Sequence, residues 1–403
     1  MPDVSFGNLL VICVIAVLAP LVIGYAPRLR VPAVVLEIVA GVVVGPSVLG
    51  WVHLDLPVQI LALVGLAFLL FLTGLEIDLR QLGGLNLRGS VLGYLTTAAL
   101  GLALGTAFSS AGLVQSPLLF AITLSATSLG LVVPVLKDAR QLDTAVGQTA
   151  ISAATVADFS AIVLLSLLFS TSGGSAGGKV VLLIAFGIFV VATALLAGRA
   201  SRSMSLGGVL DRLQDTTAQI RVRMAVVLLV AFVALAERFG LESILGAFLA
   251  GAIVSLIDRD SASHPHFRLK LEAIGFGFVI PVFFVASGVR LDLRALFEQP
   301  SALLRVPLFL LALLIVRGVP ALWFVSALGR RKTLAVGLLQ ATSLPFIVTA
   351  SQIGVLTGRM SAVTATALVC AGLLSVLVFP SLALALLKDA AGVDVTGSRQ
   401  PAS

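Results

Sequence analysis

The sequence predicts an all-α membrane protein that crosses the bilayer many times. Three observations point to this class: 59% of the 403 residues are hydrophobic, 11% are charged, and the mean hydropathy is +1.14. A soluble domain carries about 25% charged residues, so this chain has too few charges to cover a globular surface. The apolar runs are continuous rather than alternating, which argues against an outer-membrane barrel. Disorder, a collagen-like fibre and a disulfide scaffold are equally poor fits.

Thirteen segments are apolar enough to form membrane spans, each of which needs about 20 residues. They cover residues 6–25, 33–50, 57–75, 87–111, 115–137, 144–169, 179–199, 219–238, 242–257, 273–289, 302–328, 332–355 and 359–387. Glu237, Arg238 and Glu242 shorten the eighth and ninth segments, where one long hairpin is an alternative. Cys13 and Cys370 lie inside spans, where we expect free thiols that behave as small hydrophobes.

The distribution of basic residues predicts the orientation of these spans. With the N-terminus outside, 19 Lys and Arg residues fall in cytoplasmic segments or at the cytoplasmic ends of spans, six fall on the outer side, and Arg317 alone lies deep within a span. Cytoplasmic loops of membrane proteins are enriched in Lys and Arg, so we expect a multi-pass protein of the cell membrane with a cytoplasmic C-terminus. The same rule accounts for the formal charge of +7 without a nucleic-acid partner. Residues 1–7 lack the basic start of a cleavable signal.

Short motifs of the first half recur in the second half in the same order. The pairs are Leu36-Glu37 with Leu241-Glu242, Gly74–Arg80 with Gly288–Arg294, and Ala126–Leu129 with Ala341–Leu344. They map the second, third and fifth spans onto the ninth, tenth and twelfth. A displacement by seven spans is odd, so the second half is predicted to be inverted in the membrane. Inverted repeats are typical of secondary transporters, whose substrate sites lie near the midplane where the halves meet.

The repeats predict a division of the chain into four parts. Residues 1–170 form the first repeat with spans 1–6, and residues 219–387 form the second, inverted repeat with spans 8–13. Between them, residues 171–218 form a linker that contains span 7 and opens with the flexible run Thr171–Gly178. Residues 388–403 are predicted to be a short cytoplasmic tail with no nucleotide-binding domain.

Asp158 lies in the middle of the sixth span with apolar residues on both sides. Carboxylates at this depth are costly, normally face a polar cavity and mark ion or proton paths. We therefore predict that Asp158 binds a proton or a monovalent metal cation, and we assign Thr155 of the same span to this site. The alternative is a packing role, in which the carboxylate bonds a neighbouring helix.

Arg317 is the one basic residue predicted to lie deep within a span. A guanidinium stays charged in a protein, so it needs a buried anion or water, and Asp158 is the one acid nearly as deep. We predict that Arg317 compensates the charge of this site. The alternative is an arginine that reaches the membrane interface or bonds backbone carbonyls.

The two Ala-Thr-Ser-Leu segments predict broken helices in the fifth and twelfth spans. Hydroxyl residues next to Gly or Pro at corresponding positions of inverted halves are the best sequence indication of such breaks, where carbonyls and helix ends can bind a cation. Close packing of small residues is the alternative. We expect Thr127 and Ser128 to supply ligand oxygens. The residues expected to support the breaks are Gly130, Pro134, Thr342, Ser343 and Pro345.

Several longer strings make the chain resemble the second monovalent cation:proton antiporter family, the bacterial sodium/hydrogen exchangers. These strings are Pro32–Gly50, Phe71–Asp78, Ser125–Ser128, Val135–Lys137, Pro281–Gly288 and Leu291–Leu293. The resemblance implies a 13-helix homodimer with a dimerisation domain and a mobile core that moves like an elevator. It also implies that two broken helices cross near Asp158, the essential carboxylate, with Arg317 opposite.

One position departs from the family pattern. Many members place Asp, Asn or Gln directly before the essential Asp, whereas this chain has Ala157. The members that move net charge pair two Asp residues with a Lys. A single carboxylate beside a permanent cation therefore favours electroneutral exchange of one cation for one proton.

These observations together predict a secondary transporter that exchanges a monovalent cation, expected to be Na⁺, for H⁺. We expect no cofactor, and as partners only the two ions, the lipid bilayer and a second copy of the chain. K⁺/H⁺ exchange or sodium-coupled transport of an organic anion on the same fold is an alternative. An intramembrane enzyme is disfavoured, because the spans hold no His/Glu metal signature, G-x-S-x-G elbow or Ser/His pair. A receptor without transport would leave the buried charges unexplained.

Overall fold

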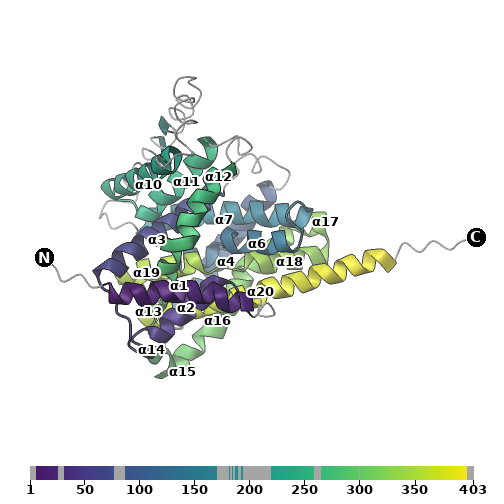
Figure 1. Cartoon of the computed structure of the whole chain (residues 1–403). Helices are drawn as coiled ribbons and strands as arrows, with labels where there is room; N and C mark the ends of the chain where they lie inside the picture. The colour runs from purple at the N-terminus through teal and green to yellow at the C-terminus, as the bar shows by residue number, and fades with distance from the viewer. Residues whose placement is uncertain are drawn as a thin grey trace, which may run out of the picture. The chain divides into compact units, whose positions relative to one another are not determined.

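The computed structural model describes residues 6–25, 31–76, 87–169, 219–257, 265–298 and 300–396, and six positions between 181 and 193. The elements in these ranges are helices, which confirms the predicted all-α class (Figure 1). Eight of the described helices are long and apolar enough to cross a membrane, and the bent pair Arg330–Gln340 and Pro345–Leu356 makes a ninth. The chain is thus a multi-pass membrane protein.

Twelve of the thirteen predicted spans coincide with described helical segments, and the span at 179–199 lies largely outside the described residues. The first half contains α1 (Gly7–Tyr25), α2 (Ala33–Val44), α3 (Leu56–Leu75), α4 (Leu87–Ser110), α5 (Pro117–Ser125), α6 (Leu129–Asp138) and α7 (Ala145–Phe169). The second half contains α10 (Ile220–Arg238), α11 (Ser243–Ile257), α12 (Pro265–Ile274), α13 (Ile280–Val289), α14 (Leu293–Glu298), α15 (Pro300–Leu303), α16 (Arg305–Gly318), α17 (Val325–Leu328), α18 (Arg330–Gln340), α19 (Pro345–Leu356) and α20 (Ala362–Thr396).

The tenth predicted span starts earlier than expected, at Pro265 instead of residue 273. A π-helical turn at Gly275–Val279 joins α12 to α13, so the helix runs on through both. Pro281 has no N–H and cannot complete the regular α-helical ladder with the preceding turn, which explains why the wider turn lies there. The charged residues of α12 hid this extension in the sequence.

The chain divides into two compact units, and each contains helices from both halves of the sequence. Unit 1 comprises residues 1–27, 36–79 and 162–290, and unit 2 comprises residues 28–35, 80–161 and 291–403. This division is spatial, so the predicted repeat boundaries, the linker 171–218 and the tail 388–403 stay predictions. The linker lies largely outside the described residues.

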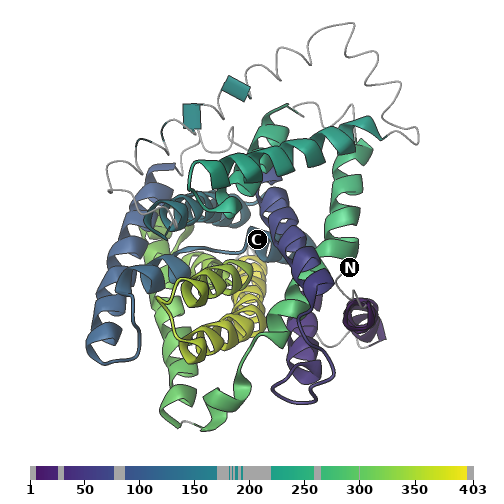
Figure 2. The same cartoon turned by 90° about the vertical axis from the view of Figure 1, so that its left-hand side faces the viewer.

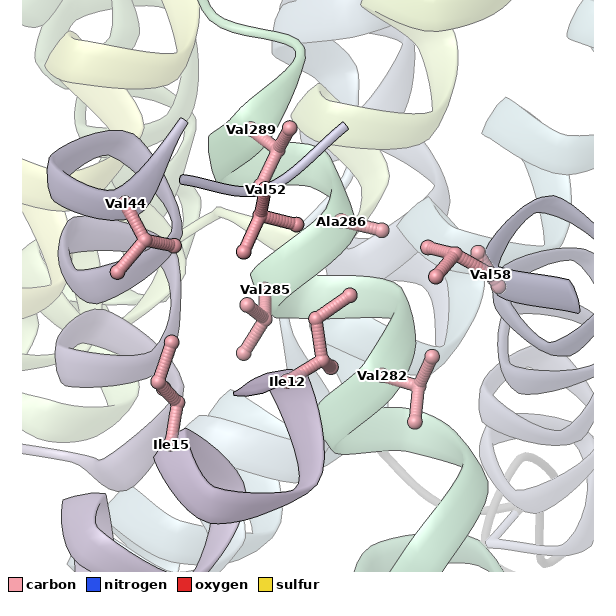
Figure 3. Packing of buried hydrophobic residues seen from close by; sticks show 10 residues of the cluster. Ile12, Ile15, Val44, Val52, Val58, Val282, Val285, Ala286 and Val289 are labelled. Atoms are coloured by element: carbon pink, nitrogen blue, oxygen red, sulfur yellow. The ribbon is translucent and has the colours of Figure 1, made fainter. Parts of the chain in front are cut away.

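Unit 1 is held together by glycines at which helix backbones touch. A Cβ atom on Gly288 of α13 would lie 2.1 Å from the carbonyl oxygen of Ile38 in α2, and one on Gly251 of α11 would lie 1.9 Å from that of Phe71 in α3. Small residues permit such approach and increase van der Waals contact between membrane helices. The adjoining apolar cluster joins α1, α2, α3 and α13, and its members include Ile12, Val44 and Val285 (Figure 3).

Unit 2 contains the two helix pairs α5–α6 and α18–α19, and other helices of the unit pack against them. Helix α4 packs on α5, and α20 packs along both α18 and α19. Figure 2 shows α18, α19 and α20 side by side, as the yellow-green and yellow helices. Its apolar cluster includes Val132 and Leu136 of α6, Val336 and Leu339 of α18, and Ala383 of α20. Both broken helices are thus packed within one unit.

The close contact at Gly288 predicts a large effect of a single methyl group. We expect Gly288→Ala to lower the stability of the folded protein by about 1–3 kcal/mol, because the new Cβ overlaps the α2 backbone. Thermal unfolding in detergent measures the change. Gly24→Ala on α1 is the control, since nothing lies within 4 Å of its added Cβ. Equal melting temperatures for the two variants would contradict the packing argument.

Candidate ion-binding site

The fifth predicted span is broken at residues 126–128. Helix α5 ends at Ser125, the backbone is extended at Ala126 and at Ser128, and α6 begins at Leu129. Pro134 lies inside α6, and the space around Gly130 is open, with nothing within 4 Å of an added Cβ. The prediction of a broken helix is therefore confirmed here.

The twelfth predicted span is broken at residues 341–344. Helices α18 and α19 meet at an angle of 41°, and α19 begins at Pro345, whose missing N–H is tolerated at a helix start. Ala341, Thr342, Ser343 and Leu344 are all fully buried. The second predicted break is confirmed as well.

The two breaks meet through direct hydrogen bonds. The backbone N–H of Ser128 donates to the carbonyl oxygen of Thr342 at 3.0 Å. The hydroxyl of Thr127 donates to the carbonyl oxygen of Gln340 at 2.8 Å. The non-helical stretches would otherwise leave buried polar groups without partners. Here the first break supplies hydrogen-bond donors, and the second break supplies the carbonyl acceptors. The crossing of the two broken helices is thus a hydrogen-bonded junction.

Asp158 lies at this junction. It belongs to α7, its side chain is 4% exposed, and its Oδ1 accepts a hydrogen bond of 2.8 Å from the backbone N–H of Thr127. The first N–H groups of α6 follow directly, and the start of a helix favours negative charge. The structure therefore brings the predicted carboxylate to the first break, 31 positions away in the chain.

Arg317 is buried at the same junction and contacts it through Thr127. Its guanidinium donates through Nε and Nη2 to the hydroxyl oxygen of Thr127, with Nε at 3.1 Å. Nε also lies 3.4 Å from the carbonyl oxygen of Gln340, and Nη1 donates to the hydroxyl of Thr97 at 3.3 Å. Thr127 therefore links the two charges, with its N–H on the carboxylate and its hydroxyl on the guanidinium.

The remaining predicted ligand residues lie near the junction in different settings. The Thr155 hydroxyl donates to the carbonyl oxygen of Ile151 at 2.9 Å, one turn earlier in α7. The side chain of Ser128 makes no capping bond to α6. The Thr342 hydroxyl donates back to Leu338 of α18 at 3.2 Å. In this conformation the Thr127 hydroxyl is occupied by Arg317 and Gln340, so a cation that uses this oxygen has to displace the guanidinium.

Sequence reasoning missed two side chains of α4. Thr97 is fully buried against Arg317, and the Tyr94 hydroxyl lies 3.5 Å from that of Ser125 at the end of α5. Their spacing of three residues places them on one helix face, and Tyr94 is one of two tyrosines in the chain. That pattern was available, but neither residue belongs to the repeated motifs. Gln340 contributes through its backbone carbonyl, for which no side-chain signal exists.

The site combines one carboxylate with neutral oxygens. Within the described ranges, no group of three or more His, Cys, Asp or Glu residues could hold a metal ion.

Comparison with known proteins agrees with this architecture. The family model for the transmembrane sodium/hydrogen exchanger matches residues 13–388. The putative Na⁺/H⁺ antiporter YjbQ of Bacillus subtilis (strain 168) is 33% identical over 370 residues, which are 88% of this chain but only 58% of that protein. A Na⁺/H⁺ antiporter of Enterococcus hirae is 31% identical over 296 residues, which are 72% of this chain and 74% of the relative.

A solved structure shows the same fold. The sodium proton antiporter MjNhaP1 from Methanocaldococcus jannaschii superposes with a TM-score of 0.67 at 18% identity, over 94% of this chain and 97% of that one. The family match covers both broken helices and the helices that carry Asp158 and Arg317. The chain therefore belongs to the sodium/hydrogen exchanger family.

Proposed function

We propose that this protein is a secondary antiporter that exchanges Na⁺ for H⁺ across the cell membrane. The observation that carries the proposal is the buried carboxylate of Asp158, held by the backbone N–H of Thr127 where two broken helices meet. A titratable group at this depth is an expensive feature that normally serves an ion path. The family, and two relatives that are themselves named as Na⁺/H⁺ antiporters, support this reading.

The proposed mechanism is competition for one carboxylate. Asp158 binds either a proton or a cation, and a bare carboxylate is too costly to carry through the hydrocarbon barrier. Only the occupied site crosses, so the proton flux in one direction is coupled to the cation flux in the other. Elevator-type movement of the part that holds the junction gives access to the two sides in turn.

The proposed ligands are the oxygens around Asp158, namely Thr127, Ser128 and Thr155. The junction residues Gly130, Pro134, Thr342, Ser343 and Pro345 hold the two breaks open. Arg317 is the proposed charge-compensating residue, and its guanidinium contacts the junction through Thr127.

The proposed setting is a homodimer in the cell membrane. The Lys and Arg distribution favours an outside N-terminus and a cytoplasmic C-terminus. Helix α1 exposes a row of large apolar side chains, which suits contact with lipid or with a second copy of the chain. The members of this row include Leu10, Val14, Val17, Leu18 and Leu21.

The function is tested in proteoliposomes loaded with a pH-sensitive dye. Addition of Na⁺, Li⁺, K⁺ or Rb⁺ in turn is expected to move protons with Na⁺ as the best substrate, and Asp158→Asn is expected to reduce the signal to that of empty vesicles. Asp143→Asn is the matched control, because Asp143 is an exposed residue just before α7. Exchange retained by Asp158→Asn would remove the carboxylate from its role, and preference for K⁺ would replace Na⁺ as the substrate.

The single carboxylate also predicts the stoichiometry. One proton replaces one monovalent cation, so the two occupied forms carry equal charge and exchange should not respond to membrane potential. Moving one net charge against 100 mV costs about 2.3 kcal/mol, roughly a 40-fold shift in the flux equilibrium. Vesicles clamped with K⁺ and valinomycin give the measurement. A dependence of Na⁺ uptake on the clamped potential would contradict 1:1 exchange.

Two substitutions of Arg317 distinguish the effect of its positive charge from the effect of its hydrogen-bond geometry. We expect Arg317→Gln to change the pH dependence of exchange, because the junction loses the buried cation that compensates the charge of the carboxylate. Arg317→Lys retains the charge but not the forked contacts to Thr97 and Thr127, so its pH profile should stay closer to wild type. Identical profiles for Arg317→Gln and wild type would contradict charge compensation.

A further inference from the structure

The second break is held by a side chain that neither broken helix supplies. Ser375 of α20 is fully buried, and its hydroxyl oxygen accepts a hydrogen bond of 3.2 Å from the backbone N–H of Ser343. The same hydroxyl lies 3.2 Å from the carbonyl oxygen of Ser343, to which it can donate. One serine therefore engages both backbone polar groups of a residue in the break.

The polar backbone groups around this break are satisfied by residues from several helices. The carbonyl of Gln340 accepts from Thr127 and Arg317, the carbonyl of Thr342 accepts from Ser128, and Ser343 is served by Ser375. Without Ser375, the N–H of Ser343 would lose the partner that it has here, in a place that water does not reach. Loss of one partner from a buried pair carries the full desolvation cost of the other.

The Ser375 hydroxyl has one proton and two possible acceptors. The carbonyl oxygen of Gly372, one turn earlier in α20, lies at 2.7 Å, and that of Ser343 lies at 3.2 Å. The proton can serve only one acceptor at a time, so the carbonyl of Ser343 shares it with that of Gly372, whereas the N–H of Ser343 donates to the Ser375 oxygen in either case. Ser375 can therefore fix the position of Ser343 through the N–H while the hydrogen bond to its carbonyl forms and breaks.

The backbone of α20 approaches the same point. A Cβ atom on Gly372 would lie 3.0 Å from the carbonyl oxygen of Ser343, which is closer than an ordinary contact. The hydroxyl of Ser343 itself is buried, and no partner for it is found among the residues that the structure describes. Helix α20 therefore holds the backbone of Ser343 and leaves its side chain unused.

We propose that Ser375 is a positioning residue for cation exchange, and this inference rests on the function proposed above. Ser375 holds Ser343, whose neighbour Thr342 accepts from Ser128, whose neighbour Thr127 donates to Asp158. Three hydrogen bonds and two short stretches of backbone thus lead from α20 to the carboxylate. Ser375 touches neither ion, but it sets where the second break stands relative to the first.

The test compares hydroxyl-lacking and hydroxyl-keeping variants in proteoliposomes. Ser375→Ala removes the hydroxyl, and Ser375→Cys keeps the volume with a weak donor and acceptor. Both are expected to raise the apparent KM for Na⁺ about tenfold with Vmax changed less than about threefold, equivalent to about 1.4 kcal/mol of binding. Ser375→Thr is expected to restore most of the affinity. The Na⁺ concentration that gives half of the thermal stabilisation in detergent should rise in parallel.

Ser381→Ala provides the matched control. Ser381 lies on the same helix, is exposed, and donates only to Leu377 one turn earlier, so its loss should leave KM unchanged. Ser375→Ala and Ser375→Cys variants with wild-type KM would overturn the inference. So would lowered melting temperatures with unaltered half-saturation by Na⁺, since they would indicate packing alone. If wild-type protein exchanges no cation, the proposed function fails; if wild type exchanges and the variants match it, only the role of Ser375 fails.

Discussion

The junction depends on the hydrogen bond between the Thr127 N–H and the Asp158 carboxylate. A helix break inside a bilayer leaves N–H and C=O groups that lipid cannot satisfy, and a buried carboxylate needs donors that apolar side chains lack. These two costs offset each other when the break supplies the donor and the carboxylate supplies the acceptor. The polar chemistry of the site and the irregular backbone are therefore the same structural feature.

The second break extends this reciprocal arrangement. Its carbonyls at Gln340 and Thr342 accept hydrogen bonds from Thr127 and Ser128 of the first break, and the Arg317 guanidinium adds a second donor to the carbonyl of Gln340. A guanidinium buried to 1% exposure is tolerable because its three nitrogens have acceptors on Thr97, Thr127 and Gln340. Every element of the junction thus relies on another for its hydrogen bonds. A buried hydrogen-bond network is costly when some of its groups lack partners. The bond that Ser375 accepts from the N–H of Ser343 matters because it satisfies one such group.

The sequence predicted the fold class well because membrane spans carry a strong local signal. A run of about 20 apolar residues has few structural options in a bilayer, and the paired Ala-Thr-Ser-Leu motifs marked both breaks correctly. The least accurate boundary was that of α12 and α13, where charged residues precede a π-helical turn and hydropathy gives no sign of the continuing helix. Asp158 and Arg317 stood out for the same reason, since a charge within an apolar run is conspicuous.

The sequence alone thus determined which segments are helices, where two of them break, and that the side chains of Asp158 and Arg317 are buried. Only the tertiary structure decided that Thr127 lies between Asp158 and Arg317, that Thr97 and Tyr94 of α4 line the junction, and that Ser375 holds the second break. Hydropathy and periodicity indicate which segments are apolar enough to cross the bilayer. Hydrogen bonds such as that between Arg317 and Thr97, 220 positions apart, depend on how the helices pack, and no local pattern encodes that.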